Sequence, residues 1–275
     1  MSTFVPLRFG PAHRTVLGLL QQPASSAQGS GSFLLARPIG LAATRSASMF
    51  RVLSDRLCRQ GATVMRFDYH GTGDAPGDEV TQSLEGWTRD VQEAHHALGH
   101  AVTAAHTDWF GMGLGANLMA LAALRSPRPP RRLVLWEPIE HGPAHIDDWL
   151  AAHRRELAMQ LADTWPRLVA RGMAAEPEIP GSVLGFDIGQ QLHNDLLNLP
   201  ALAPWLRMAV ERGAQVTLCG APERLARWTQ ALPDNVRTEV LQVPLTSQTN
   251  WLSSEAMGAA IVPPELGRIL EILSP

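Results

Sequence analysis

The sequence predicts an α/β protein in which a mostly parallel central sheet is covered by helices on both faces and carries a small helical cap insertion. Short strand-type runs alternate with runs at helical spacing over most of the chain, which is typical of βαβ units. A glycine-rich turn, GMGLGA at 111–116, follows one strand-type run. Between 143 and 207 the strand-type runs disappear.

Composition limits the class of protein. The chain has 275 residues, 45% of them hydrophobic, and a formal net charge of −3, which fits a globular protein without general affinity for nucleic acid or an anionic membrane. No apolar run is long enough to cross a bilayer, and VLGLL at 16–20 is too short for a signal-peptide core. Cys58 and Cys219 are too few for a disulfide framework. We therefore expect a cytoplasmic protein.

The N-terminal half predicts an antiparallel strand pair followed by a βαβ unit. The runs at 4–10 and 14–23 have no helical stretch between them, so we expect them to pair antiparallel. The runs at 32–38 and 62–69 flank a helical stretch. We expect the strand at 62–69 to lie beside the strand that leads into the glycine-rich turn.

The rest of the chain continues the alternation with one interruption. The expected elements are helices at 83–98 and 116–125, strands at 107–110, 133–138, 214–220 and 238–244, and a closing helix at 263–273. From 143 to 207, tryptophan, leucine, arginine and proline are mixed without strand-like runs. We assign 143–207 as the helical cap insertion, and 1–142 with 208–275 as the core.

The turn Gly111-Met112-Gly113-Leu114-Gly115 has the spacing of a nucleophile elbow, G-x-S-x-G, with glycine at its centre. Such a turn joins a strand to a helix and needs small residues where the helix start crowds its neighbours. Glycine tolerates the strained backbone at the centre of the elbow more easily than serine does. The turn therefore predicts elbow geometry without a nucleophile.

Two other interpretations of the turn stay open. Gly111-x-Gly113-x-x-Ala116 also satisfies the dinucleotide-binding fingerprint, with Glu137 about 20 residues further on. Against this interpretation, the fingerprint normally opens the first βαβ unit of its domain, whereas at least two strands and two helices precede it here. In the third interpretation, the glycines only permit close packing of a helix on a strand.

Several segments of the chain resemble α/β-hydrolase proteins found with bacterial exosortase A systems. These segments are RPIGLAATRSASMFRVLSDRL, VMRFDYHGTGDAPGD, GWTRDVQEA, GMGLGA, LVLWEPIEHG and WLSSEAMGAAIVPPELGRI. The resemblance covers the chain from about residue 4 to its end. It implies an α/β-hydrolase fold of the serine esterase and peptidase type, and a real elbow whose centre is often not serine.

The positions of the histidines bear on a catalytic triad. In the α/β-hydrolase fold the catalytic histidine follows the last strand, which we expect to begin near 238. All ten histidines precede that strand, the last being His193, and LTSQTNW stands where the histidine loop is expected. Glu223 fits the position of the acid. Without serine and histidine, general-base activation of a hydroxyl lacks its parts, so we expect no conventional serine hydrolysis.

A ligand pocket is expected beyond the carboxyl ends of the strands. The amides of Ile39 or Gly40 and of Leu114 can form an oxyanion-hole pair, which binds a carbonyl oxygen whether or not anything attacks it. The other substrate-binding candidates are Arg37, Met112, Gly113, Trp149, Asn250 and Trp251.

The candidate acids and bases are His70, Glu137 and His141. For each, a structural or ligand-orienting hydrogen bond is the preferred interpretation over catalysis. His96 and His100 have metal-ligand spacing but no evident third ligand, so we expect no metal and no cofactor.

The expected function is a hydrolase-like protein that binds an acyl or ester-type ligand, or a partner enzyme in a biosynthetic or export pathway. One alternative is a non-standard acyl ester or thioester hydrolase or acyltransferase that uses His70, Glu137 or His141 as acid or base. A second alternative is a dinucleotide-binding oxidoreductase. The arginines at 125, 128, 131 and 132 form either an exposed loop, which we favour, or a docking patch for an acidic carrier protein.

Overall fold

The computed structural model describes residues 2–24, 31–246, 249–253 and 263–274. In chain order the strands of its main sheet are β1 (Thr3–Phe9), β2 (Val16–Gln22), β3 (Ser32–Ala36), β4 (Thr63–Asp68), β5 (Thr107–Met112), β6 (Arg132–Trp136), β9 (Gln215–Gly220) and β10 (Leu241–Pro244). They lie in the order β1-β2-β4-β3-β5-β6-β9-β10. The pairs β1–β2 and β2–β4 are antiparallel and the other pairs are parallel. The predicted fold class is confirmed.

The position of β4 differs from the expectation. Strand β3 lies between β4 and β5, because Leu34 pairs with Met65 on one side and with Trp109 on the other. The connection through residues 40–59 leads from β3 to β4, on the side of β2. The connection through residues 84–101 then leads from β4 past β3 to β5. The two crossover helices lie on opposite faces of the sheet, so both connections keep the usual hand while moving in opposite directions. The expected contact between the strand at 62–69 and the turn strand is therefore wrong.

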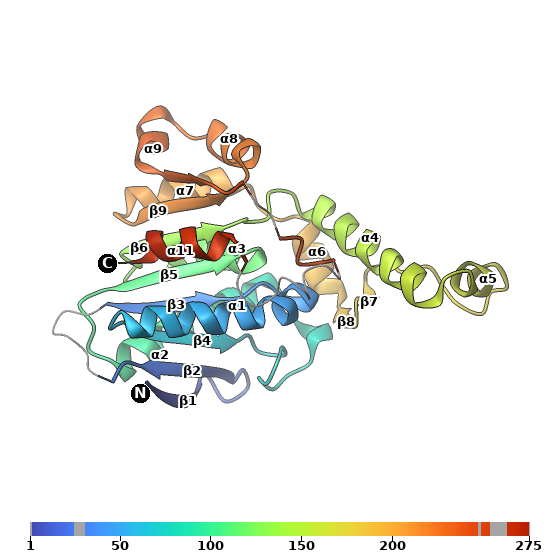
Figure 1. Cartoon of the computed structure of the whole chain (residues 1–275), viewed down its shortest axis with the longest axis horizontal. Helices are drawn as coiled ribbons and strands as arrows, with labels where there is room; N and C mark the ends of the chain where they lie inside the picture. The colour runs from blue at the N-terminus through green and yellow to red at the C-terminus, as the bar shows by residue number, and fades with distance from the viewer. Residues whose placement is uncertain (1, 25–30, 247–248, 254–262, 275) are drawn as a thin grey trace.

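Helices cover both faces of the sheet (Figure 1). On one face lie α1 (Gly40–Arg59) and α11 (Glu265–Leu273); on the other lie α2 (Leu84–Ala101), α3 (Leu114–Arg125), α7 (Leu202–Glu211), α8 (Pro222–Gln230) and α9 (Asp234–Glu239). The last strand begins at Leu241 rather than near 238, because α9 occupies the residues before it. Among the described residues, no helix is long and apolar enough to cross a membrane.

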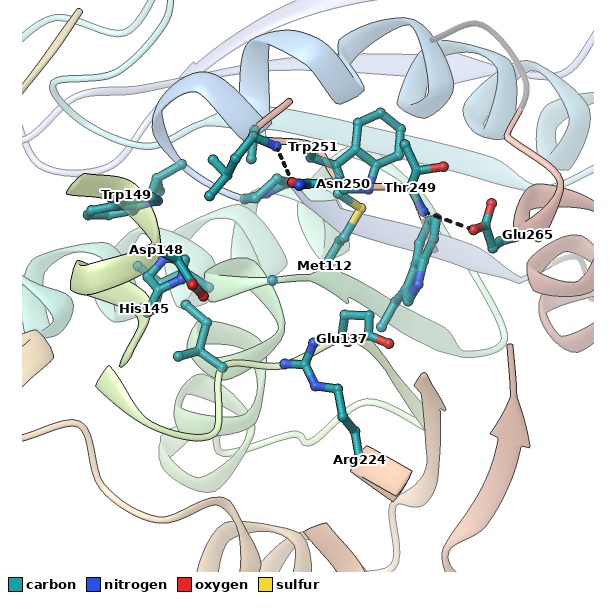
Figure 2. A pocket seen from close by; sticks show the side chains of 18 of the residues that line it. Met112, Glu137, His145, Asp148, Trp149, Arg224, Thr249, Asn250, Trp251 and Glu265 are labelled. Carbon is teal, nitrogen blue, oxygen red and sulfur yellow. Dashed lines mark hydrogen bonds and ion pairs between the residues drawn. The ribbon is translucent and has the colours of Figure 1, made fainter. Parts of the chain in front are cut away.

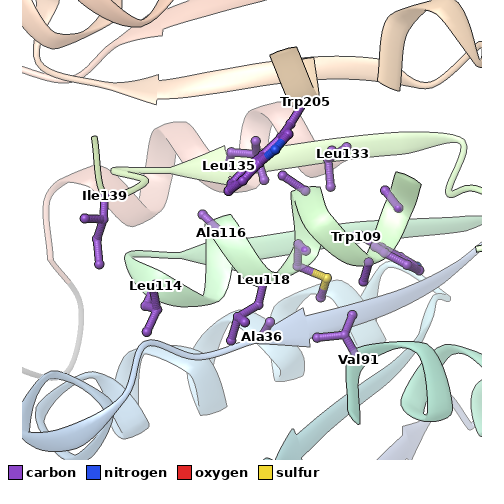
Figure 3. Close-up of a cluster of buried hydrophobic side chains, with 14 of the residues drawn as sticks. Ala36, Val91, Trp109, Leu114, Ala116, Leu118, Leu133, Leu135, Ile139 and Trp205 are labelled. Carbon is purple, nitrogen blue, oxygen red and sulfur yellow. The ribbon is translucent and has the colours of Figure 1, made fainter. Parts of the chain in front are cut away.

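Side chains of the strands alternate between two apolar clusters, as a period of two residues requires. Phe33 and Leu35 of β3 pack in the cluster under α1 and α11, whereas Leu34 and Ala36 pack in the cluster under α2, α3 and α7. Figure 3 shows the second cluster, in which α3 lies against β5 and β6 with Trp205 of α7 beside it. The glycine-rich turn therefore begins on a strand that is buried on both faces.

The segment between β6 and α7 is mostly helical. It consists of α4 (Gly142–Leu161), α5 (Thr164–Ala170), the antiparallel pair β7 (Gly181–Val183) and β8 (Phe186–Ile188), and α6 (Gln190–Leu197); the short helix η1 (Glu79–Thr81) contacts its end. In Figure 1, α4 and α5 extend away from the sheet. Helix α7, which the sequence-based division places mostly in the insertion, packs on α3 and β9. The boundaries of the cap stay a prediction.

Two glycines make the turn between β5 and α3 possible. A Cβ atom on Gly111 would lie 2.7 Å from Ala116 Cα, and one on Gly115 would lie 2.3 Å from the carbonyl oxygen of Arg37. Both neighbours are backbone atoms, which cannot rotate away as a flexible side chain can. The first turn of α3 is thereby held directly against the end of β3.

Gly115→Ala should lower the free energy of unfolding by about 2 kcal/mol or more, because the added methyl group must push two backbones apart. The measurement is urea denaturation. Gly99→Ala in α2 is the matched control: a Cβ there meets no described atom within 4 Å, so stability should rise by up to about 1 kcal/mol. Equal effects of the two substitutions would contradict the close contact.

Candidate ligand-binding site at the strand-to-helix turn

A cavity of about 440 Å³ lies over the turn between β5 and α3 (Figure 2). Its walls come from the sheet, from α4 and from the segments on both sides of the C-terminal gap in the described chain. Seven of the predicted substrate-binding residues line it: Ile39, Met112, Gly113, Leu114, Trp149, Asn250 and Trp251. A cavity of this size suits a small organic ligand.

Two predicted substrate-binding residues are not among the described residues that line the cavity. The Arg37 side chain turns toward β4, where it forms an ion pair with Asp68. Gly40 begins α1 and faces the ring of Phe186, 3.7 Å from its would-be Cβ, at a separate small hollow. Ile39 lines the cavity, whereas the next residue, Gly40, already lies at the other hollow.

Two of the three candidate acids and bases also lie elsewhere. His70 Nδ1 is 2.9 Å from the carbonyl oxygen of Thr15, so the ring is turned toward β2 rather than toward Gly113. His141 caps α4, and its Nδ1 accepts a hydrogen bond from the Ala144 amide at 3.2 Å. Neither histidine is among the described residues that line the cavity, so the structure does not bring these two histidines together with Glu137.

Gly113 has a backbone conformation that favours glycine, with φ 56° and ψ −130°. Its N–H donates to the carbonyl oxygen of Trp136 at 2.9 Å. Unlike its neighbours in the turn, Gly113 does not face backbone atoms: among described atoms, its would-be Cβ meets only the Pro38 side chain, in a tight contact of 3.3 Å with Cβ. The space where a side chain would stand therefore belongs to the cavity.

The starts of two helices meet at this space. Leu114 opens α3 and Gly40 opens α1, and neither start has a side-chain cap within the described chain. Their first turns contain no acidic residue. Amides in a first helical turn have no partner within the helix and carry partial positive charge. This end of the cavity therefore suits a carbonyl or other electron-rich oxygen.

Glu137 directly follows β6 and lines the cavity. Its carboxylate makes structural bonds, in line with the interpretation that we prefer for it from the sequence. Its Oε1 accepts from the Ala221 amide at 3.0 Å, and its carboxylate forms an ion pair with Arg224. Burial raises the pKa of Glu137, and the Arg224 guanidinium opposes that shift. Because Arg224 also stacks on Trp228, 5.1 Å from the ring centre, the carboxylate is held in place on two sides.

His145 of α4 is the histidine that lines the cavity, and the sequence analysis did not single it out. Its ring packs against Trp149 with 4.5 Å between centroids. Burial, with a smaller contribution from the Arg224 guanidinium, lowers the pKa of His145 to about 4. The missed signal is helical spacing: His145 lies three residues before Asp148 and four before Trp149, so its side chain neighbours both of theirs on α4.

Asn117 of α3 fixes the loop that follows Glu137. The side chain is fully buried at 0% exposure, donates to the carbonyl oxygen of Ile139 and accepts from the Ile139 amide, both at 2.8 Å. The Asn117 side chain thus satisfies both the N–H and the carbonyl oxygen of Ile139, as a neighbouring strand would do in a sheet. The helix that opens at the turn thus also positions the opposite wall of the cavity.

The remaining candidate groups have structural partners. His96 and His100 are exposed with 3.0 Å between their Nε2 atoms, and the described residues hold no group of three or more His, Cys, Asp or Glu suited to a metal. Three of the four arginines form ion pairs: Arg125, at the end of α3, with Glu85, and Arg131 and Arg132 with Asp108. The expected exposed loop does not include Arg132, which begins β6 and has a side chain only 15% exposed.

Asn117→Ala should lower the free energy of unfolding by about 2–4 kcal/mol, because it leaves a buried N–H and a buried carbonyl without partners. Urea denaturation measures the change. Asn235→Ala, at an exposed position of α9, is the control and should shift stability by less than about 0.5 kcal/mol. A small effect at Asn117 would mean that the loop is not held by this side chain.

The pKa of His145 gives a pH prediction. The folded value of about 4 lies below the ordinary 6.5, so between these pH values the unfolded chain binds a proton that the folded chain does not. Wild type should therefore lose stability relative to His145→Gln as pH falls from about 7 to about 4.5, by about 1–2 kcal/mol given partial exposure of the ring. Urea denaturation of both proteins at the two pH values tests this. A constant difference would contradict the low pKa.

Comparison with known proteins gives the family. A family model of serine aminopeptidases, S33, matches residues 43–183, just over half of the chain. The fold is similar to a thermostable carboxyl esterase from Bacillus coagulans (TM-score 0.64, 10% identity, 98% of each chain covered). It is also similar to a proline iminopeptidase from Mycobacterium smegmatis (TM-score 0.54, 16% identity, 98% of this chain and 100% of that chain).

These identities show a common fold and nothing further. No curated protein sequence matches the chain. The strand order, the elbow-type turn and the match over residues 43–183 agree with one another. The chain therefore belongs to the S33 serine aminopeptidase family of α/β hydrolases.

Proposed function

We propose that this α/β-hydrolase-fold protein binds an acyl or ester-type ligand over Gly113 and has no conventional Ser-His-acid triad. The observation that carries the proposal is that Gly113 lines the cavity. Backbone atoms would clash with a side chain at Gly111 and Gly115, whereas the described atom nearest to a Cβ on Gly113 is a side-chain carbon of Pro38, at 3.3 Å. The positive φ of Gly113 favours glycine, and without a side chain there a ligand carbonyl can approach the Leu114 amide closely.

The chemistry of the surrounding side chains supports binding rather than conventional hydrolysis. No histidine follows His193 in the sequence, and Thr249, Asn250 and Trp251 line the cavity in the segment after β10. The expected acid, Glu223, is an exposed residue in the first turn of α8. Among the described residues that line the cavity the one histidine is His145, whose pKa is lowered to about 4, which makes it a weak base for a hydroxyl placed at the elbow.

The two alternative functions are not favoured. The acyl hydrolase or transferase uses His70, Glu137 or His141 as acid or base; of these only Glu137 is among the described residues that line the cavity, and its carboxylate is bound by the Ala221 amide and Arg224. The dinucleotide interpretation required a free acid for the ribose, whereas the Glu137 carboxylate is occupied by the Ala221 amide and Arg224.

The setting of the protein is part of the proposal. The resemblance to proteins of exosortase A systems supports a role in a bacterial biosynthetic or export pathway, with a small acyl compound or a partner enzyme as the bound species. An acidic carrier protein docking on the exposed arginine loop stays a prediction. Mass spectrometry of compounds that co-purify with the native protein identifies the ligand directly.

The test uses variants at Gly113. Wild type and Gly113→Ser should both hydrolyse p-nitrophenyl acetate no faster than Gly113→Trp, because an unactivated hydroxyl is a weak nucleophile. Neither should be labelled by a fluorophosphonate. In calorimetry, wild type should bind 3-methylbutyl acetate, an uncharged ester, and Gly113→Trp should not, because the indole fills the space over the turn.

Gly113→Ala is the matched control for the binding measurement. It carries the same backbone strain at positive φ, about 1–3 kcal/mol, but adds little volume, so binding should persist. Normal binding by the tryptophan variant would show that the ligand lies elsewhere. Enzyme-like turnover by wild type or by the serine variant, together with fluorophosphonate labelling, would show that a triad exists after all.

A further inference from the structure

One end of the main sheet has apolar side chains on the side that its helices leave open. Val5, Leu7 and Phe9 of β1 pack against the cluster under α2, and because side chains alternate along a strand, the residues between them point to the α1 side. Helix α1 packs on β4 and touches β2, and in Figure 1 β1 lies beyond it. The strand register places six residues on this surface, which we call the β1–β2 face: Phe4, Pro6 and Arg8 of β1, Leu17 and Leu19 of β2, and Arg66 of β4.

The apolar part of the β1–β2 face is open to water. Phe4 is 51% exposed, Pro6 is also exposed, and Leu17 and Leu19 are half-buried. None of these four side chains belongs to either apolar cluster of the described residues. A contiguous apolar surface of this kind marks a place that another molecule covers.

The dimensions of this surface match one helix. Strands β1 and β2 have seven residues each, so they are about 24 Å long and together about 10 Å wide. A helix of about 16 residues has the same length and a diameter of about 10 Å. A helix lying beside α1 would therefore complete the helical layer on this side of the sheet.

Arginines border the apolar strip and lack carboxylates to balance them. Asp68, which follows Arg66 on the same side of β4, is paired with Arg37. Arg8 and Arg51 are exposed, and within the described chain neither they nor Arg66 form an ion pair. Burial, together with the neighbouring guanidinium groups of Arg37 and Arg51, lowers the pKa of Arg66. Three like charges are thus close together.

The balance of charge favours an acidic occupant. Asp74 also lies near Arg37, so four arginines are set against two aspartates and positive charge is in excess. The arginines at 125–132 differ, because among the described residues Arg128 alone of those four has no ion pair. An acidic partner therefore finds more unpaired guanidinium groups on the β1–β2 face than on that surface.

We propose that the β1–β2 face docks a helix of a partner protein that has an apolar stripe along its centre and carboxylate side chains at its edges. The stripe covers the apolar side chains of the two strands. The carboxylates pair with Arg8, Arg51 and Arg66, whose planar guanidinium groups suit two-point contacts with carboxylates. This inference does not depend on the ligand proposed at the elbow, so each can fail without the other.

Two labelled peptides of about 16 residues test the inference by fluorescence anisotropy. Both carry leucine at helical spacing on one face; the other positions are glutamate in one peptide and lysine in the other. Wild type should bind the glutamate peptide with a Kd below about 100 µM, and at least about tenfold more tightly than the lysine peptide, because like charges repel across an interface. Arg8→Glu and Arg51→Glu should each weaken binding of the glutamate peptide about fivefold or more, and Arg66→Gln and Phe4→Ser about threefold or more.

Two substitutions are matched controls. Arg128→Glu changes the charge as Arg8→Glu does, and Leu241→Ser removes a side chain that is 56% exposed from β10, at the opposite end of the sheet. Both should leave the Kd within about twofold of wild type. Arg8 is exposed, so its variant keeps the test valid if Arg66→Gln does not fold.

Several results overturn the inference. They are absence of glutamate-peptide binding, equal affinity for the lysine peptide, and equal weakening by Arg128→Glu, which would mean that binding follows general charge. Sedimentation equilibrium covers the remaining occupant. A wild-type dimer that Phe4→Ser dissociates would assign the β1–β2 face to a second copy of this chain and would overturn the partner helix.

Discussion

The contact between the first turn of α3 and the end of β3 sets the geometry on which the candidate site depends. Gly115 lies against the backbone of Arg37 so closely that any side chain would enter the carbonyl oxygen. This contact brings the start of α3 beside the start of α1, because α1 follows β3 after a few residues. Two helix starts and one open glycine then share a single space at the carboxyl edge of the sheet.

Segments far apart in the chain close the cavity through a few polar side chains. Arg45 of α1 donates to Glu156 of α4 at 3.1 Å and to the carbonyl oxygen of Trp251 at 3.4 Å. The arginine side chain is only 7% exposed, so its charge is held inside the contact between three segments. Two parts of the cavity wall, α4 and the segment around Trp251, are therefore both hydrogen-bonded to α1.

Features encoded locally could be predicted from the sequence, and features set by tertiary contacts could not. The glycine spacing of the turn and the apolar runs located the strands and seven cavity residues, because both depend on neighbouring residues. Strand β4 was predicted to be the neighbour of β5, but β3 is. The sequence of a crossover helix does not determine toward which edge of the sheet the chain continues. His70 was misplaced because its loop folds back onto Thr15. Arg224 was missed because its helix is oriented by packing against β9 and α7.

Hydrogen bonds within the protein fix the shape of the cavity wall formed by the loop after β6. Bonds from Asn117 hold Ile139 on one side, and the Cys219 carbonyl and the Ala221 amide hold Glu137 on the other. A ligand that meets this wall does not have to order it, so little conformational entropy is lost there on binding. The sheet side acts as a preorganised template, and selectivity against ligands of the wrong shape originates there.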